Sequence, residues 1–232
     1  MAVPATIGQL REKLFEMEIG DYIVWKYDNT TSGYIFGGST TGYTEIPLTG
    51  NPLASMPLKY FWYAIKVDKG LLIADRVVSN TTTWDWLNSN KFVESSPRII
   101  SETSGVVRCP SGGVAYADAN GNKSNTDLGF GAFPTINEWD KNIINFPVTN
   151  IISGKKLDDI FHYLDNYTWC KETPISGTWK DKAGNSTTSA SNTQRVGRGS
   201  NTRAQWGDIN YNASSSSSAT WGFRPVFEYR EV

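Results

Sequence analysis

The last forty residues constrain this chain most, because two blocks rich in glycine and arginine bracket a polar segment. Residues 195–200 read RVGRGS, and residues 221–226 read WGFRPV. Between them, residues 201–220 show almost no hydrophobic periodicity. A buried element needs apolar side chains at regular spacing, whereas an exposed loop does not. The pattern therefore predicts two strand-like scaffold blocks with a displayed loop between them.

The composition fits one folded domain and argues against two classes of partner. The 232 residues carry a formal net charge of −1 with no basic block, and 39% of them are hydrophobic, which is ample for a core. A nucleic-acid-binding surface needs a cluster of basic residues, and anionic membranes also attract basic clusters. We therefore expect no nucleic-acid partner and no membrane insertion.

The first twenty residues predict an amphipathic helix. Thr6 and Gln9 have the spacing of a capping box. The apolar residues at helical spacing are Ile7, Leu10, Leu14 and Met17, ending at Gly20. We expect residues 1–20 to pack on the same chain, and the alternative is an attachment arm that docks on a neighbouring subunit. No uninterrupted apolar run occurs there, so no signal peptide is expected.

Residues 21–232 predict a single domain of many short strands and few helices. Aromatic and β-branched runs at residues 22–27 and 60–67 are typical of strands, and residues 71–74 predict the second arm of a hairpin. Helices are expected at three places only: after Thr82 or Thr83, after a capping box at residues 135–138, and around residues 157–164. In the last of these, residues 161–164 (FHYL) could equally form a strand. Because strands and helices do not alternate as βαβ units, the expected fold class is α+β.

Three blocks occur in order: residues 133–140 (FPTINEWD), residues 167–172 (YTWCKE), and residues 195–200 with residues 222–224. Together they resemble a known family, the C-type-lectin-like domains of the formylglycine-generating-enzyme type. Residues 133–140 (FPTINEWD) resemble its Leu-Pro-Thr-x-x-Glu-Trp-Glu block, and residues 167–172 (YTWCKE) stand where it has Val-Trp-Glu-Trp-x-x-Asp. Residues 195–200, followed by residues 222–224 (GFR), resemble its Arg-Val-x-Arg-Gly-Gly-Ser and closing Gly-Phe-Arg blocks. The resemblance rests on residues 110–232. We expect the arginines in these blocks to make structural ion pairs or carbonyl contacts.

That family contains oxidases, iron-dependent enzymes and non-enzymatic binding proteins. The oxidases use a cysteine pair shortly before the closing Gly-Phe-Arg, and residues 199–222 contain no cysteine. Iron sites need several histidines or carboxylates, and the one histidine, His162, lies in an aromatic stretch typical of a packed residue. The resemblance therefore implies the binding branch, with no catalytic residue. This branch includes phage receptor-binding tail proteins and the variable proteins of diversity-generating retroelements.

In that branch the binding residues lie between the last two blocks. The matching positions here are Asn201, Arg203, Gln205, Trp206, Asp208, Asn210, Tyr211 and Asn212. Aromatic side chains supply rigid contact area and amides supply adaptable hydrogen bonds. The alternative is a solvated polar loop with Trp206 tucked into the domain.

The resemblance implies a component of a phage tail or phage-tail-like particle that recognises a host cell-surface glycan or protein. We expect the chain in the virion, extracellular after release, beside other particle subunits and as a homo-oligomer such as a trimer. Two alternatives remain open: a structural or decorating subunit whose loop contacts its neighbours, and an oxidase-like enzyme that uses Cys170.

Two smaller questions remain open in the sequence. Oxygen side chains at Asp118, Asn120, Asn122 and Asp127 alternate as in a calcium loop. A plain hairpin turn is the preferred interpretation, because no glutamate closes the loop and Asn-Gly is a common turn pair. Cys109 and Cys170 are the only cysteines, and their spacing does not show whether they form a disulfide.

Overall fold

The computed structural model describes residues 3–28, 33–48, 59–163, 166–199 and 209–231. Strands take up 39% of the structure and helices 11%, so the architecture is mostly β. The expected α+β class is therefore wrong. The segments predicted as helices form only short turns, which are too small to make a helical layer against a sheet.

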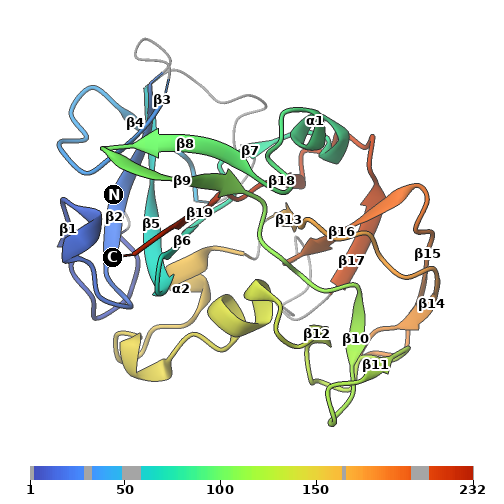
Figure 1. Cartoon of the computed structure of the whole chain (residues 1–232). Helices are drawn as coiled ribbons and strands as arrows, with labels where there is room; N and C mark the ends of the chain where they lie inside the picture. The colour runs from blue at the N-terminus through green and yellow to red at the C-terminus, as the bar shows by residue number, and fades with distance from the viewer. Residues whose placement is uncertain (1–2, 29–32, 49–58, 164–165, 200–208, 232) are drawn as a thin grey trace.

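A curled sheet of nine strands forms one half of the molecule (Figure 1). In spatial order its strands are β1 (Leu10–Arg11), β2 (Tyr22–Asp28), β5 (Tyr60–Asp68), β6 (Leu71–Ala74), β19 (Val226–Tyr229), β9 (Thr103–Arg108) and β8 (Ser96–Ile100), with β3 (Gly33–Phe36) beside β2 and β4 (Thr44–Glu45) beside β5. Ser101 Oγ joins the β8–β9 turn to β3, because it accepts from Phe36 N at 3.0 Å and donates to Phe36 O at 3.1 Å.

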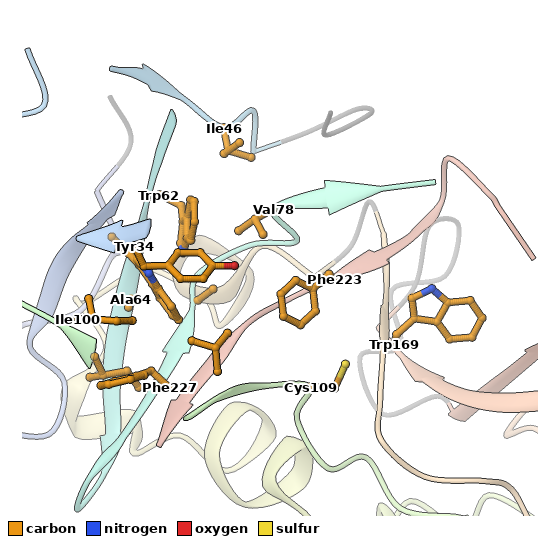
Figure 2. Packing of buried hydrophobic residues seen from close by; sticks show 14 of the residues in the cluster. Tyr34, Ile46, Trp62, Ala64, Val78, Ile100, Cys109, Trp169, Phe223 and Phe227 are labelled. Carbon is orange, nitrogen blue, oxygen red and sulfur yellow. The ribbon is translucent and has the colours of Figure 1, made fainter. Parts of the chain in front are cut away.

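The largest apolar core lies against this curled sheet. Trp25 and Trp62 are cross-strand partners in β2 and β5, with ring centroids 5.4 Å apart. Figure 2 shows Trp62 with Tyr34 and Phe227 in the same cluster. Large buried rings supply most of the apolar area in such a core. The strands predicted at residues 22–27, 60–67 and 71–74 are confirmed.

A second sheet holds the two scaffold blocks predicted near the C-terminus. Its five strands are, in order, β17 (Ile209–Ala213), β16 (Gln194–Arg198), β13 (Tyr167–Trp169), β18 (Trp221–Phe223) and β7 (Ser79–Asn80). The middle strand, β13, runs antiparallel to β16 and parallel to β18. The first block therefore lies on one side of β13 and the closing block on the other, as the sequence predicts for a scaffold.

Two smaller sheets lie beyond this second sheet, on the far side from the chain ends (Figure 1). One contains β11 (Lys123–Ser124), β10 (Ala115–Ala117) and β12 (Ala132–Phe133), and the other is the hairpin of β14 (Gly177–Lys180) and β15 (Ser186–Ser189). Asp127 N donates to Lys180 O at 2.8 Å, so the two sheets are joined through their backbones.

The helical segments of the described residues are all short. They are α1 (Trp84–Ser89), α2 (Asp158–Phe161), a π-helical turn (Trp139–Ile144) and the 3₁₀ turns Leu14–Glu16 and Val148–Asn150. Thr83 caps α1 as predicted, because its Oγ1 accepts from Trp86 N at 3.0 Å. The capping box predicted from Thr135 is wrong. Asn137 Oδ1 takes that role and accepts from Asp140 N at 2.9 Å.

The helix predicted over residues 1–20 is also wrong. The chain there forms strand β1, which is parallel to β2, followed by the 3₁₀ turn. The carboxylate of Asp21 explains this, because it accepts from Gln9 N at 2.7 Å, from Glu18 N at 3.0 Å and from Arg11 Nε at 2.6 Å. These hydrogen bonds hold the segment as a loop against the sheet, so tertiary contacts override the helical spacing.

Candidate binding surface

The three sequence blocks that carry the family resemblance meet around one buried indole. Trp139, in the first block, has no exposed surface. The guanidinium carbons of Arg198 and Arg224 each lie 5.8 Å from its ring centroid. These arginines come from strand β16 and from the connection between β18 and β19. A cation over an indole face is stabilising. Arg224 Nε also donates to Thr168 Oγ1 of the second block at 3.1 Å, so side chains of all three blocks are joined here in one centre.

Arg198 makes the ion pair of this centre. Its Nη2 lies 2.6 Å from Asp140 Oδ1, and its Nη1 donates to Gly112 O at 2.6 Å. Asp140 Oδ2 also accepts from Ala132 N at 2.6 Å and from Asn137 Nδ2 at 2.8 Å. A buried carboxylate needs this many partners, because burial without them disfavours its charge. The structural ion pair expected of Arg198 is present.

Arg224 makes the carbonyl contacts expected of it. Its Nη1 donates to Ala74 O at 2.8 Å, its Nη2 to His162 O at 3.1 Å and its Nε to Thr168 Oγ1 at 3.1 Å. Burial lowers the pKa of Arg224 to about 10, so the side chain stays charged near neutral pH. It therefore joins strands β6 and β13 to the segment after α2.

Two glutamates hold the backbone turn at residues 110–113 between these blocks. Glu138 Oε2 accepts from Ser111 N at 2.9 Å, and Arg108 Nη1 donates to the same oxygen at 2.7 Å. Burial opposes ionisation of Glu138, but the hydrogen bonds and charge of Arg108 outweigh it and lower the pKa of Glu138. Glu172 Oε2 accepts from Gly112 N at 2.9 Å. Burial raises the pKa of Glu172 to about 7.

Glu172→Gln tests this raised pKa. A carboxyl whose pKa is raised on folding adds stability that is complete below its unfolded pKa and is lost as the pH rises through the folded pKa of about 7. The amide cannot ionise and can still accept from Gly112 N. We expect the variant to exceed the wild type by about 1 to 3 kcal/mol in free energy of unfolding at pH 8, with near equality at pH 4.

Urea denaturation at four pH values between 4 and 8 measures that difference. The exposed Glu102→Gln serves as the control and should keep the pH dependence of the wild type. Equal slopes of stability against pH in Glu172→Gln and the wild type would contradict the prediction.

The two cysteines are free, buried thiols. Burial raises the pKa of both Cys109 and Cys170. Because the thiolate is the nucleophilic form, thiols protonated in this way are poorly suited to attack a substrate. Their surroundings do not favour the oxidase-like hypothesis for Cys170.

The predicted binding residues fall into two groups. Five of them lie in residues 200–208, outside the described residues: Asn201, Arg203, Gln205, Trp206 and Asp208. The other three, Asn210, Tyr211 and Asn212, lie on β17. The pairing of β17 with β16 includes Arg198 opposite Ile209. Residues 200–208 therefore connect the two strands of a hairpin, and the paired residues at its base are part of the scaffold.

The three described residues do not share one face of β17. Asn210 and Asn212 are partly exposed, whereas Tyr211 is only 7% exposed and packs 6.5 Å from the ring of Trp179. Tyr211 is thus placed as an interior residue, which does not suit the ligand contact predicted for it. The sequence signal was available, because residues 209–213 (INYNA) alternate apolar and polar side chains as a half-buried strand does.

The two asparagines cap the open edge of this sheet. Val196 uses its N–H for Glu172 O and its carbonyl for Cys170 N, on the side away from β17. Its cross-strand partner Tyr211 therefore directs its N–H outward. Asn210 Oδ1 accepts from this N–H at 2.8 Å, and Asn212 Oδ1 accepts from Ala213 N at 2.9 Å.

Helix α1 lies next to the end of β17. Asp85 N donates to Ser214 O at 3.1 Å, and Asp85 Oδ2 lies 3.2 Å from Ser214 Oγ. Arg195, opposite Asn212 in the sheet, places its guanidinium 4.5 Å from the ring centroid of Trp84. We define the β17–α1 surface as the exposed or partly exposed side chains of these two elements and of Arg195 on the neighbouring strand β16. Its members are Asp85, Trp86, Arg195, Asn210 and Asn212.

Sequence reasoning missed the α1 part of this surface. Residues two apart on a helix point in different directions, so Trp84 and Trp86 cannot both face the core. Leu87 shares a face with Trp84 at spacing i, i+3, and both are buried. Trp86 is therefore left on the outside, which the pattern of apolar residues alone could have indicated.

The calcium candidates form a hydrogen-bonded turn. Asp118 Oδ1 accepts from Asn120 N and from Asn122 N, both at 2.8 Å, and Asp127 Oδ1 accepts from Gly129 N at 2.8 Å. Backbone donors thus already use one carboxylate oxygen of each aspartate. Within the described ranges, no group of three or more histidine, cysteine, aspartate or glutamate side chains could hold a metal ion.

His162 is largely buried, which lowers its pKa.

Comparisons with known proteins give no further assignment. No protein-family model, curated protein or solved structure matches this chain. The resemblance of its three blocks to the formylglycine-generating-enzyme type therefore stays a prediction from sequence. Among the described residues, no helix combines the length and apolar character that crossing a membrane requires.

Proposed function

We propose that this chain is a non-enzymatic binding component of a phage tail or phage-tail-like particle. It recognises a molecule on the host surface through residues 200–208 and the adjoining β17–α1 surface. In the particle it is displayed in several copies, and multivalent display turns weak single-site binding into strong attachment.

The observation that carries this proposal is the anchoring of the predicted binding segment. The strand that precedes this segment, β16, ends at Arg198, whose guanidinium forms an ion pair with Asp140. Its second strand, β17, packs Tyr211 into the interior. Binding residues commonly lie on loops that a rigid scaffold positions, and in the sequence the five predicted residues of the range 200–208 lie between these two anchored strands.

One other observation favours a second function, that of a structural or decorating subunit. Apolar side chains are exposed where the N-terminal segment meets the segment after the π-helical turn. The two segments are joined by hydrogen bonds from Ile7 N to Asn150 O and from Ile152 N to Ala5 O. The exposed side chains are Val3, Ile7, Ile19, Val148 and Ile152. Such a group of apolar residues is typical of a protein contact.

Attachment of the labelled protein to intact bacterial cells distinguishes the two functions. We expect the wild type to attach and Trp206→Ala to attach about ten-fold more weakly, because truncated aromatic anchors cost most at binding surfaces. Phe15→Ala is the control, since Phe15 is an aromatic side chain 81% exposed on the N-terminal segment. A folded wild type that attaches to no cell would favour the structural subunit.

A further inference from the structure

Trp86 is a half-exposed indole that the fold holds in one place. Its side chain is 52% exposed, whereas Trp84 and Leu87 of the same helix are buried. The ring stacks on Phe92, with centroids 6.2 Å apart and planes at 14°. Phe92 in turn packs 5.4 Å from the buried ring of Phe223. Because the indole is already ordered, a ligand that stacks on it does not have to immobilise a mobile side chain.

Three exposed polar side chains belong to the segments that hold this indole and its Phe92 partner. Asp85 precedes it in the chain, and Asn90 donates from Nδ2 to the Trp86 carbonyl at 2.8 Å. The guanidinium carbon of Arg98 lies 5.5 Å from the ring centroid of Phe92. Together they offer a carboxylate acceptor, an amide that both donates and accepts, and a guanidinium donor. This set of groups suits a ligand that carries many hydroxyls.

We propose that Trp86 is the stacking platform of a carbohydrate site that takes a neutral sugar ring. One face of such a ring presents C–H groups that pack on an indole, while its hydroxyls reach polar groups at the rim. A charged ligand would need side chains of one sign, and Asp85 and Arg98 carry opposite charges. A protein partner would need a wider apolar centre. The nearby exposed Ile99 alternates with Arg98 along β8 and points to the other face.

This inference rests on the proposed function and assigns the class of ligand to its surface. The test uses the full chain and intact bacterial cells that are untreated, oxidised with periodate or digested with protease. Polysaccharide extracted from bound cells serves as the soluble competitor. Periodate cleaves sugar diols, so we expect it, and not protease, to abolish attachment, and we expect the polysaccharide to compete.

Trp86→Ala should weaken attachment about ten-fold, while Phe15→Ala attaches as the wild type does. Circular dichroism and the midpoint of thermal unfolding check that each variant folds. Trp86→Phe keeps a smaller ring on Phe92 and should weaken attachment by about three-fold, so the proposal stays testable even if the alanine variant does not fold.

Three results would overturn the proposal, and they differ in what they leave standing. Attachment that survives periodate and is lost with protease identifies a protein receptor, which removes the sugar site but keeps the proposed function. Periodate-sensitive attachment that is unchanged in both Trp86 variants places the sugar elsewhere on the chain. A folded wild type without any attachment overturns both proposals.

Discussion

Arg198→Met is expected to destabilise the protein by about 3 to 5 kcal/mol, because it leaves a buried carboxylate without its cation. The methionine matches the length of the apolar stem, so the loss reports mainly on charge. Asp140 then keeps only its neutral donors, from Ala132 N and Asn137 Nδ2. Urea denaturation of the wild type and the variant measures the difference in free energy of unfolding.

A double-mutant cycle separates the ion pair from the loss of packing. Asp140→Asn in the Arg198→Met background should recover part of the stability, since no unpaired charge remains buried. Lys141→Met is the matched control, because it removes the exposed ion pair with Asp68 and is expected to cost less than about 1 kcal/mol. Additive effects of the two buried substitutions would show that Arg198 and Asp140 are not coupled.

Gly222→Ala is expected to destabilise the closing block by about 1 to 3 kcal/mol, because an added methyl group has no room. A Cβ at this position would lie 2.2 Å from Ser79 O and 2.5 Å from Val77 Cγ1. The first contact is with a backbone atom, so the clash is relieved only by moving β7 away from β18. Thermal and urea unfolding measure the loss.

Gly33→Ala is the matched control, because a Cβ added to that strand glycine meets no atom within 4 Å. We expect its stability to stay within about 0.5 kcal/mol of the wild type. An equal loss in both variants would assign the effect to the backbone preference of alanine and would contradict the steric explanation.

The strands were predictable where the side chains alternate or where apolar residues run without a break. Residues 22–27 and 60–67 are rich in aromatic and β-branched side chains, which prefer a pleated and largely buried backbone. The hairpin turn before residues 71–74 was predictable from the turn residues 68–70 (DKG). These elements form the centre of the large sheet, so its central strands could be predicted from the local preferences of their residues alone.

The fold class was wrong because the helical signals were overridden by tertiary contacts. The spacing of Leu14 and Met17 suits a helix, yet both are buried from a loop that Asp21 holds in place. A Cβ at Gly8 would lie only 2.1 Å from Gly20 O, so the close approach of two backbone segments also shapes this region. Neither contact can be read from hydrophobic periodicity.

The candidate binding surface was predictable only in part. The resemblance placed the binding residues between the last two blocks, but it did not separate Tyr211, which faces inward, from Asn210 and Asn212. It also omitted Trp86, since helix α1 lies more than a hundred residues earlier in the chain. Helix α1 lies next to β17 because Asp85 contacts Ser214. These two residues are far apart in the sequence, so no local pattern indicates their contact.

Charged residues in the blocks that carry the resemblance have structural roles in this chain. Arg198, Arg224 and Glu138 all use their charges within the protein, on Asp140, on backbone carbonyls and on Arg108. Side chains that the fold uses in this way are not available to a ligand, and function depends on the site that a scaffold carries. The proposed binding therefore depends on side chains other than these three.

The hairpin of β16 and β17 also makes this chain suitable as a display frame for foreign peptides. The Cα atoms of the cross-strand pair Arg198 and Ile209 lie about 5 Å apart, and residues 199–208 connect them in the sequence. Since loop-closure entropy grows with the logarithm of length, doubling this connection costs only about 0.6 kcal/mol. A library with random sequence and varied length in these positions would keep the same folded base, so selection would act on binding alone.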